Sequence, residues 1–267
     1  MKRIRYPGHV LGMLAATGVI LTGGSLFGRL VAAPPAEVEL AGYATNLQGR
    51  TESQRHNARL AADALNGRII PPGKVFSFNE SVKSWSVDAG YVKAPVSYDG
   101  ELLRAFGGGV CQTSTTLYNA ALLAGLPIVE RHPHVYTAHY VPPGHDAAVA
   151  QPSIDLRFRN PYSWPIRIQA SARHDRLSVK LFGARKPATQ VEVIGDVLSA
   201  DLPARYTRTI SGQETASRRF VRTPGAPGCR VITWRVFSTE GKEIRRERLS
   251  DDTYESMNRV TQIVEGD

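Results

Sequence analysis

The sequence has few cysteines, no internal repeat and no low-complexity tract. Two cysteines in 267 residues, Cys111 and Cys229, are too few for a disulfide framework, which leaves one bridge or two free thiols. Hydrophobic residues make up 42% of the chain and charged residues 21%. Both values are near the globular average, so a disordered or collagen-like chain is excluded. The length predicts one full-sized domain, or one domain with a small companion.

Acidic residues are also in short supply. The chain has 24 Asp and Glu against 33 Lys and Arg, which gives a formal net charge of +9. A basic surface favours polyanions, which include nucleic acid, acidic lipid and anionic wall polymer. The charge alone does not choose among these partners.

The first forty residues predict the compartment. Lys2, Arg3 and Arg5 precede an uncharged run from Val10 to Gly28, an order typical of an export signal or a single membrane anchor. At 1.5 Å per residue this run reaches about 28 Å, close to the thickness of the hydrocarbon core. The positive flank stays inside, so the main domain is expected outside the cell membrane, single-pass or, after cleavage near Ala33, secreted. Nucleic acid is then excluded as a partner.

Start and stop signals predict two helices. Thr51 and Gln54 form a capping box, so a helix should run from there to Asn66 and stop at Gly67. A second, mostly buried helix is expected from Cys111 to Ala124, because this segment lacks Pro and Gly.

Alternating patterns predict strands through the rest of the chain. Short strands are expected at 76–78, 135–141 and 154–158, a hairpin at 166–170 and 177–181, and further strands at 231–237 and 242–249. Helices early and antiparallel strands late predict an α+β fold. We divide the chain into the N-terminal segment and linker (1–41), a main domain (42–184) and a basic β-rich module (185–267).

The sharpest chemical feature is the run GGGVCQTSTTLY at 107–118. A cysteine after three glycines, at the start of a helix, sits among unpaired N–H groups at the positive end of the dipole, which lowers the pKa of a thiol. Thr113 and Ser114 are candidate donors to an oxyanion. Two other interpretations of Cys111 stay open: a small buried core residue and a disulfide to Cys229.

A nucleophile needs a base, and four of the seven histidines fall between residues 131 and 146. We take His134 as the base for Cys111, Asp146 as the group that orients it, and His132 as a supporting residue. The order of cysteine, histidine and polar residue is that of papain-like and NlpC-type thiol enzymes. A metal site remains an alternative, because His132, His134, His139 and Cys111 are all zinc-type ligands.

Six blocks of this sequence resemble the VanW family. They are PGKVFSFN at 72–79, AGY at 89–91, GGGVCQTSTTLYN at 107–119, ERHPH at 130–134, YVPPGHDAAV at 140–149 and DLRFRN at 155–160. The resemblance implies an α+β VanW-type domain at the bacterial envelope and a peptidoglycan setting, with Cys111, His134 and Asp146 inside the strongest blocks. Residues 81–88 lack the expected Gly-Pro-Arg-Thr-like tetrapeptide, and His145 replaces a commonly apolar residue, which would alter the mouth of a site.

Two functions follow from these observations. The first is a Cys-dependent hydrolase or transferase that acts on peptidoglycan or its lipid-linked precursor, with no cofactor. The second is a non-catalytic module that binds wall polymer, in which Cys111 is structural and the basic C-terminal part holds an anionic polymer. In the enzyme, the Cys111 sulfur should lie near a histidine nitrogen.

Overall fold

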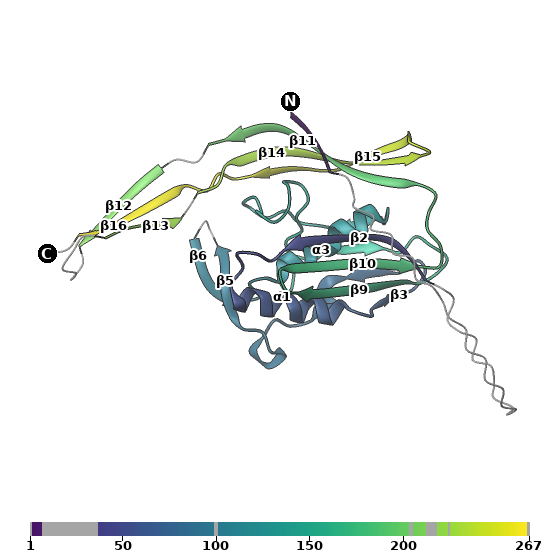
Figure 1. Cartoon of the computed structure of the whole chain (residues 1–267), viewed down its shortest axis with the longest axis horizontal. Coiled ribbons are helices and arrows are strands. Elements are labelled where there is room, and N and C mark those ends of the chain that lie inside the picture. Colours follow the sequence, from purple (N-terminus) through teal and green to yellow (C-terminus); the bar gives the residue numbers. More distant parts are fainter. Residues whose placement is uncertain are drawn as a thin grey trace, which may run out of the picture.

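A central helix, α3 (Val110–Leu123), packs beside α1 (Glu52–Leu65) on one face of a four-stranded antiparallel sheet (Figure 1). The sheet order is β2 (Val38–Asn46), β10 (Arg176–Gly183), β9 (Ile166–Arg173) and β3 (Ile69–Ile70). This computed structural model describes residues 2–6, 37–98, 101–202, 205–211, 218–223 and 225–265. The fold is α+β and mostly antiparallel sheet, which confirms the predicted class.

Both predicted helices form. Thr51 caps α1 and accepts from the Gln54 backbone N–H, while the Gln54 side chain accepts from the Thr51 N–H. This capping box satisfies two of the N–H groups at the helix start. Helix α1 buries a face of small and branched residues, namely Ala58, Ala61, Ala62 and Leu65. Helix α3 ends before Gly125, whose backbone has φ +72°.

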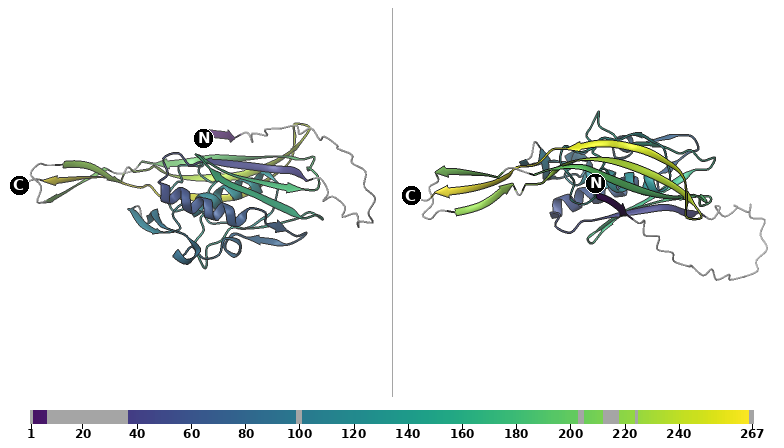
Figure 2. Two further views of the ribbon diagram at one scale, coloured as in Figure 1. Left: turned by 60° about the horizontal axis from the view of Figure 1, so that its bottom comes forward. Right: turned by 90° about the horizontal axis from the view of Figure 1, so that it is seen from above.

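A second, long sheet follows the main domain and arches over it (Figure 1). Its order is β1 (Lys2–Tyr6), β11 (Gln190–Asp201), β14 (Gly228–Thr239) and β15 (Lys242–Tyr254), all antiparallel. Beyond it lies a three-stranded sheet that extends away from the helices (Figure 2), with β12 (Arg205–Ser211), β16 (Arg259–Glu265) and β13 (Arg218–Thr223). The predicted hairpin turn at Glu240–Gly241 is present between β14 and β15.

Small elements complete the main domain. One sheet contains β4 (Val75–Ser77), β8 (Arg157–Arg159) and β7 (Ile128–Glu130); a hairpin contains β5 (Lys93–Tyr98) and β6 (Glu101–Phe106). Two short helices, α2 (Phe78–Val82) and the 3-10 turn η1 (Val87–Ala89), precede this hairpin. The sequence patterns predicted neither these helices nor the hairpin β5–β6. The hairpin at 166–183 is confirmed.

One predicted strand is displaced and another is wrong. The strand expected at 76–78 forms at Val75–Ser77, because the Ser77 hydroxyl caps α2 and turns Phe78 into the first residue of that helix. The strand expected at 135–141 is an irregular loop. In this loop the Val135 carbonyl accepts from the Glu255 backbone N–H at 2.8 Å, and the bridge between His132 and Ala148 lies outside it.

The predicted membrane segment, Val10 to Gly28, lies outside the described residues. Among the helices in the described ranges, none combines the length and the apolar character needed to cross a membrane.

Candidate active site

Cys111 is the second residue of α3, and its position depends on the three glycines before it. Gly109 caps the helix with φ +107°, and a Cβ there would lie 2.2 Å from the Gln54 carbonyl oxygen. A Cβ on Gly108 would lie 2.6 Å from the Pro95 carbonyl oxygen. Only glycine can bring the chain this close to α1 and β5. The loop therefore presses the start of α3, and Cys111 with it, against its neighbours.

Two buried polar side chains of α1 lock this loop. Asn57 donates to the carbonyl oxygens of Val92 and Gly108, each at 2.9 Å, and accepts from the Val92 N–H. Gln54 donates to the Pro95 carbonyl at 2.9 Å. The start of α3, the start of α1 and the hairpin β5–β6 are thus joined by hydrogen bonds around the cysteine.

The structure brings Cys111, His134 and Asp146 together. His134 Nδ1 lies 2.6 Å from Asp146 Oδ2, and the His134 backbone N–H donates to the same oxygen at 2.7 Å. Because Nδ1 is taken by the carboxylate, Nε2 is the nitrogen left to interact with Cys111, whose thiol donates to the Val149 carbonyl at 3.4 Å. The His134 side chain is 27% exposed and that of Asp146 only 1%. The imidazole therefore bridges a half-buried thiol and a buried carboxylate.

The electrostatics favour a charged pair. Burial raises the pKa of Cys111, but the hydrogen bond and positive charge of His134 outweigh it, so the pKa lies below its ordinary value. Burial lowers the pKa of His134, yet its bonds to Asp146 and Cys111 raise it to about 10. The lowered pKa of the thiol and the raised pKa of the imidazole both favour a thiolate beside an imidazolium.

Asp146 is held in place by Arg131, which follows β7, and by Tyr254 at the end of β15. Arg131 donates to its Oδ1 at 2.9 Å and, through Nε, to its backbone carbonyl at 2.7 Å. The hydroxyl of Tyr254, at the end of β15, also donates to Oδ1 and accepts from the Gly144 N–H at 2.8 Å. Arg131 is itself paired with Asp252 of β15 at 2.6 Å. Burial opposes ionisation of Asp146, but His134, Arg131 and Tyr254 lower its pKa to about 2.

A second group of side chains lies near the thiol. Tyr140 is close enough to Cys111 that the thiolate charge, after burial, raises the pKa of its phenol. The Arg50 guanidinium lies 4.9 Å from the centre of the Tyr140 ring, and its Nε donates to Gln112 Oε1 at 2.9 Å. Gln112 follows Cys111 directly, so Arg50 is tied to the first turn of α3.

Three predicted supporting residues do not face the thiol. The Thr113 hydroxyl donates to the Ala58 carbonyl at 3.2 Å, and that of Ser114 donates to the Ala147 carbonyl at 2.6 Å. Both are fully buried and their hydroxyl groups donate to these carbonyls, so a role as oxyanion donors stays a prediction that these bonds do not favour. His132 Nε2 lies 3.0 Å from Glu130 Oε1.

Three other expectations concerned a disulfide, a metal site and the place of His145. Cys111 and Cys229 are both free thiols, so the disulfide is wrong. No group of three or more His, Cys, Asp or Glu able to hold a metal occurs in the described part of the chain. His145 is not at the mouth of the site: it is buried and bonded to Asn119 through Nδ1, and burial lowers its pKa to about 4.

Sequence reasoning missed Arg131, Tyr254, Arg50 and Tyr140 as members of this constellation. Arg131 stands within the block ERHPH, three residues before the predicted base, and that proximity was an available signal. Tyr254 and Arg50 carry no such signal, because only the folded chain brings them near the thiol.

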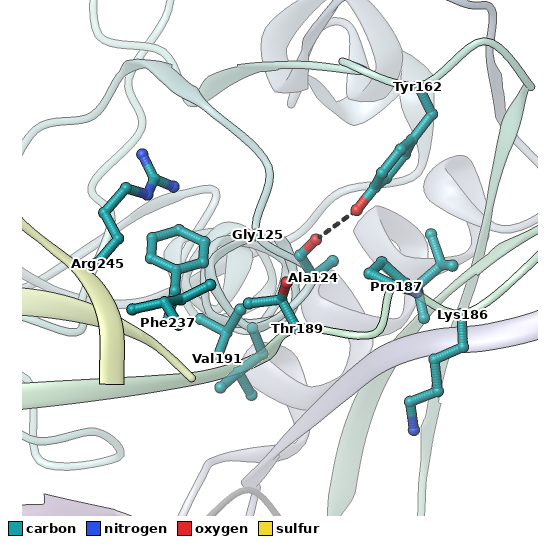
Figure 3. A pocket seen from close by; sticks show the side chains of 12 residues that line it. Ala124, Gly125, Tyr162, Lys186, Pro187, Thr189, Val191, Phe237 and Arg245 are labelled. Carbon is teal, nitrogen blue, oxygen red and sulfur yellow. Dashed lines mark hydrogen bonds between the residues drawn. The ribbon is translucent and has the colours of Figure 1, made fainter. Parts of the chain in front are cut away.

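A pocket of about 490 Å³ lies at the opposite end of α3 (Figure 3). Ala124, Gly125, Tyr162 and Phe237 are among its lining residues, and Tyr162 donates to the Ala124 carbonyl. Neither Cys111 nor His134 lines it. This pocket and the side chains of Cys111 and His134 are therefore at different ends of one helix.

Fold and site together define an α+β protein with a Cys–His–Asp constellation at the start of its central helix. Residues 53–182 match the family described as VanW like protein, and this chain carries a VanW-family domain there, as the six blocks predicted. Similar curated proteins are the uncharacterized protein YoaR of Bacillus subtilis (strain 168) and the vancomycin B-type resistance protein VanW of Enterococcus faecalis (strain ATCC 700802 / V583).

YoaR is 39% identical over 146 residues, which cover 55% of this chain and 48% of that protein. The Enterococcus protein is 31% identical over 141 residues, 51% of each. The chain thus spans about half the length of the curated relatives it matches. Among solved structures, HP0197-G5 is 18% identical and covers 28% of this chain and 92% of that one; its TM-score of 0.15 carries no argument.

Proposed function

We propose that this protein is a thiol-dependent acyl hydrolase or transferase of the cell envelope, which acts on peptidoglycan or its lipid-linked precursor. The observation that carries the proposal is the Cys111–His134–Asp146 arrangement, in which a half-exposed imidazole bridges a thiol of lowered pKa and a buried carboxylate. Nucleophile, base and orienting group in that order are the parts that covalent acyl transfer needs.

The chemistry needs no further group from the protein. The Cys111 thiolate attacks an amide carbonyl carbon, and the His134 imidazolium gives its proton to the leaving amine as the carbon–nitrogen bond breaks. The resulting thioester is attacked by water or by an acceptor amine, which gives a proton to His134 as the carbon–sulfur bond breaks. The thiolate and the imidazolium are then restored. Asp146 keeps the imidazole oriented throughout.

The test compares the wild type, Cys111→Ser, His134→Ala and the double mutant on purified peptidoglycan, with release of stem peptides or formation of new cross-links as the readout. We expect all three variants to be about equally inactive, because members of one catalytic unit do not add. Melting temperatures of the same samples separate chemistry from folding.

His132→Ala is the matched control, since His132 lies two residues away and pairs with Glu130. It should keep wild-type activity. A wild type without turnover, or a fully active Cys111→Ser, would overturn the proposal.

The second candidate is a wall-polymer binding module. Its support is the basic C-terminal part, where residues 201–250 hold eleven Lys and Arg against five Asp and Glu. Much of that charge is paired on β14 and β15, as in Arg230–Asp251 at 2.9 Å and Arg246–Glu243 at 2.8 Å. Co-sedimentation with purified wall polymer that Cys111→Ser leaves unchanged, without any turnover, would favour this candidate.

The location outside the membrane is part of the proposal. A chain that crosses a membrane between residues 10 and 28 puts β1 and β11 on opposite sides, so the anchor excludes the β1–β11 pairing. Protein that stays in the membrane pellet after a high-salt wash, with its N-terminus intact, supports the anchor. Release with an intact N-terminus supports the strand pairing, and an N-terminus near Pro34 supports cleavage and secretion.

A further inference from the structure

Arg50 is a cation without an anionic partner in the described part of the chain. Its Nε donates to a neutral amide oxygen of Gln112 and its guanidinium lies over the ring of Tyr140, whereas Arg131 pairs with two carboxylates. Burial lowers its pKa, and no carboxylate offsets that effect. A half-buried charge that lacks a counter-ion is costly unless a ligand supplies one.

Hydrogen bonds around Gln112 fix the orientation of the Arg50 guanidinium. Gln112 is itself buried, and its amide nitrogen donates to Thr45 Oγ1 at 3.0 Å and to the Asn46 carbonyl at 2.9 Å. All three bonds fix the amide so that its oxygen faces Arg50. The guanidinium is therefore oriented by Gln112 and Tyr140, while its two terminal nitrogens have no protein acceptor among the described residues. A guanidinium with its terminal N–H groups free is suited to bidentate binding of a carboxylate.

The location ties this cation to the thiol. Gln112 is the residue after Cys111, and the charges of both Cys111 and Arg50 act on the Tyr140 phenol. Arg50 also lowers the pKa of His139, after burial. Asp146 also acts on the Tyr140 phenol, more weakly than Arg50, and no carboxylate is among the groups that act on Arg50.

We propose that Arg50 is a specificity-determining residue that binds a free carboxylate of the acyl substrate close to the bond attacked by Cys111. The inference rests on the proposed function and names its substrate class: peptides with a free carboxylate next to the reacting amide. That carboxylate belongs either to the C-terminus of the peptide or to an acidic side chain, and the two sources present the same group to the guanidinium.

Two small reagents test the inference without knowledge of the substrate. Iodoacetate carries a carboxylate, whereas iodoacetamide has nearly the same shape and no charge. We expect the rate ratio of iodoacetate to iodoacetamide at Cys111, measured at low salt by peptide mass spectrometry, to fall about tenfold in Arg50→Gln. The rate with iodoacetamide should stay within about twofold of wild type, and Arg50→Lys should keep part of the preference.

Arg59→Gln is the matched control, because it removes the same charge from an exposed position on α1 and should leave the ratio unchanged. The comparison between variants also removes the attraction that His134 itself exerts on iodoacetate.

Protection of Cys111 from iodoacetamide distinguishes the carboxylate sources. The probes are N-acetyl-Ala-Ala as free acid and as amide, and N-acetyl-glutamate amide, each at millimolar concentration. Protection by the free acid alone assigns a C-terminal carboxylate; protection by the glutamate derivative assigns a side chain. Loss of either protection in Arg50→Gln is expected.

Failure of the inference differs from failure of the proposed function. If Cys111 does not react with iodoacetamide at all, the thiol enzyme is overturned, and the carboxylate site with it. If Cys111 reacts but the iodoacetate ratio is the same in wild type and Arg50→Gln, or no carboxylate protects, only the role of Arg50 is overturned.

Discussion

The two ends of α3 meet the same C-terminal sheet in different ways. At the N-terminal end, Asp252 and Tyr254 of β15 reach Arg131 and Asp146 through charged hydrogen bonds. At the C-terminal end, Phe237 packs near Gly125 beside an open pocket (Figure 3). The pocket end has open space beside the Arg235–Glu247 pair, whereas the other end has a buried cluster of titratable groups around Asp146.

Arg235 of β14 caps the C-terminal end of α3. Its Nη1 donates to the Leu126 carbonyl at 2.7 Å, and its Nε donates to Glu247 at 2.6 Å. Cations stabilise the negative end of a helix dipole. Contacts at the C-terminal end of α3 thus stabilise the helix, whereas contacts at its N-terminal end orient Cys111 and His134. A substitution can change one set of contacts without the other.

The largest expected effect is on stability at the C-terminal end. Arg235→Leu removes a buried cation and leaves carbonyl groups without a donor, so the free energy of unfolding should fall by about 3 kcal/mol. Alkylation of Cys111 in the folded protein should not change. Arg246→Gln, in an exposed pair with Glu243, should cost less than about 1 kcal/mol. Urea unfolding measures both; a reactivity loss in Arg235→Leu would show that the two ends are coupled.

The next effect is on reactivity at the N-terminal end. His134→Ala removes the hydrogen bond and charge that lower the pKa of Cys111, while burial, which raises it, remains. The rate of iodoacetamide reaction at pH 6 should fall by an order of magnitude or more, because the fraction of thiolate falls when the pKa of the thiol rises. Equal rates in both proteins at pH 6 would contradict a thiolate–imidazolium pair.

Acid titration gives the third effect. The pKa of Asp146 is about 2 in the folded protein against about 3.9 in an unfolded chain. A depressed pKa contributes stability above the unfolded value and loses it as the pH falls through the folded one. The stability of wild type should therefore decline between about pH 4 and pH 2, by about 2 kcal/mol from this group. Asp146→Asn should start less stable and show a shallower decline over that range.

Tyr254→Phe should have the smallest effect. It removes a single donor to Asp146 and the acceptor for the Gly144 N–H, with the ring and its packing kept. We expect a loss of about 1–2 kcal/mol in stability and a fewfold slower reaction of Cys111 at pH 6. Tyr162→Phe, which removes a comparable hydroxyl at the pocket end, should leave the reaction rate unchanged.

Local signals predicted the local structure of this protein well. The capping box at Thr51 and Gln54 fixed the start of α1, and the glycines on either side of 110–123 fixed α3, because these signals act within one turn of helix. The same reasoning located Cys111, His134 and Asp146, which belong to short blocks. It failed for 135–141, where Val135 is 57% exposed and its carbonyl accepts from the Glu255 N–H without forming a ladder of strand pairs.

The rest of the site depends on distant contacts. Tyr254 lies 108 residues from Asp146 along the chain and reaches it only through the register of β15 on β14. Arg50 is positioned by Gln112, 62 residues away. No pattern within a short window contains such pairings, so sequence reasoning found the reactive groups but not those that hold and surround them.

The contribution of β15 to Asp146 sets a limit on how this domain can be moved between proteins. A fragment cut at the end of the VanW match, residue 182, would lose both Tyr254 and Asp252, and Arg131 would then face a single carboxylate. Such a fragment keeps Cys111, His134 and Asp146 but not the clamp on the last of them. For recombinant expression or grafting onto another chain, the smallest unit with a complete site therefore runs through Tyr254.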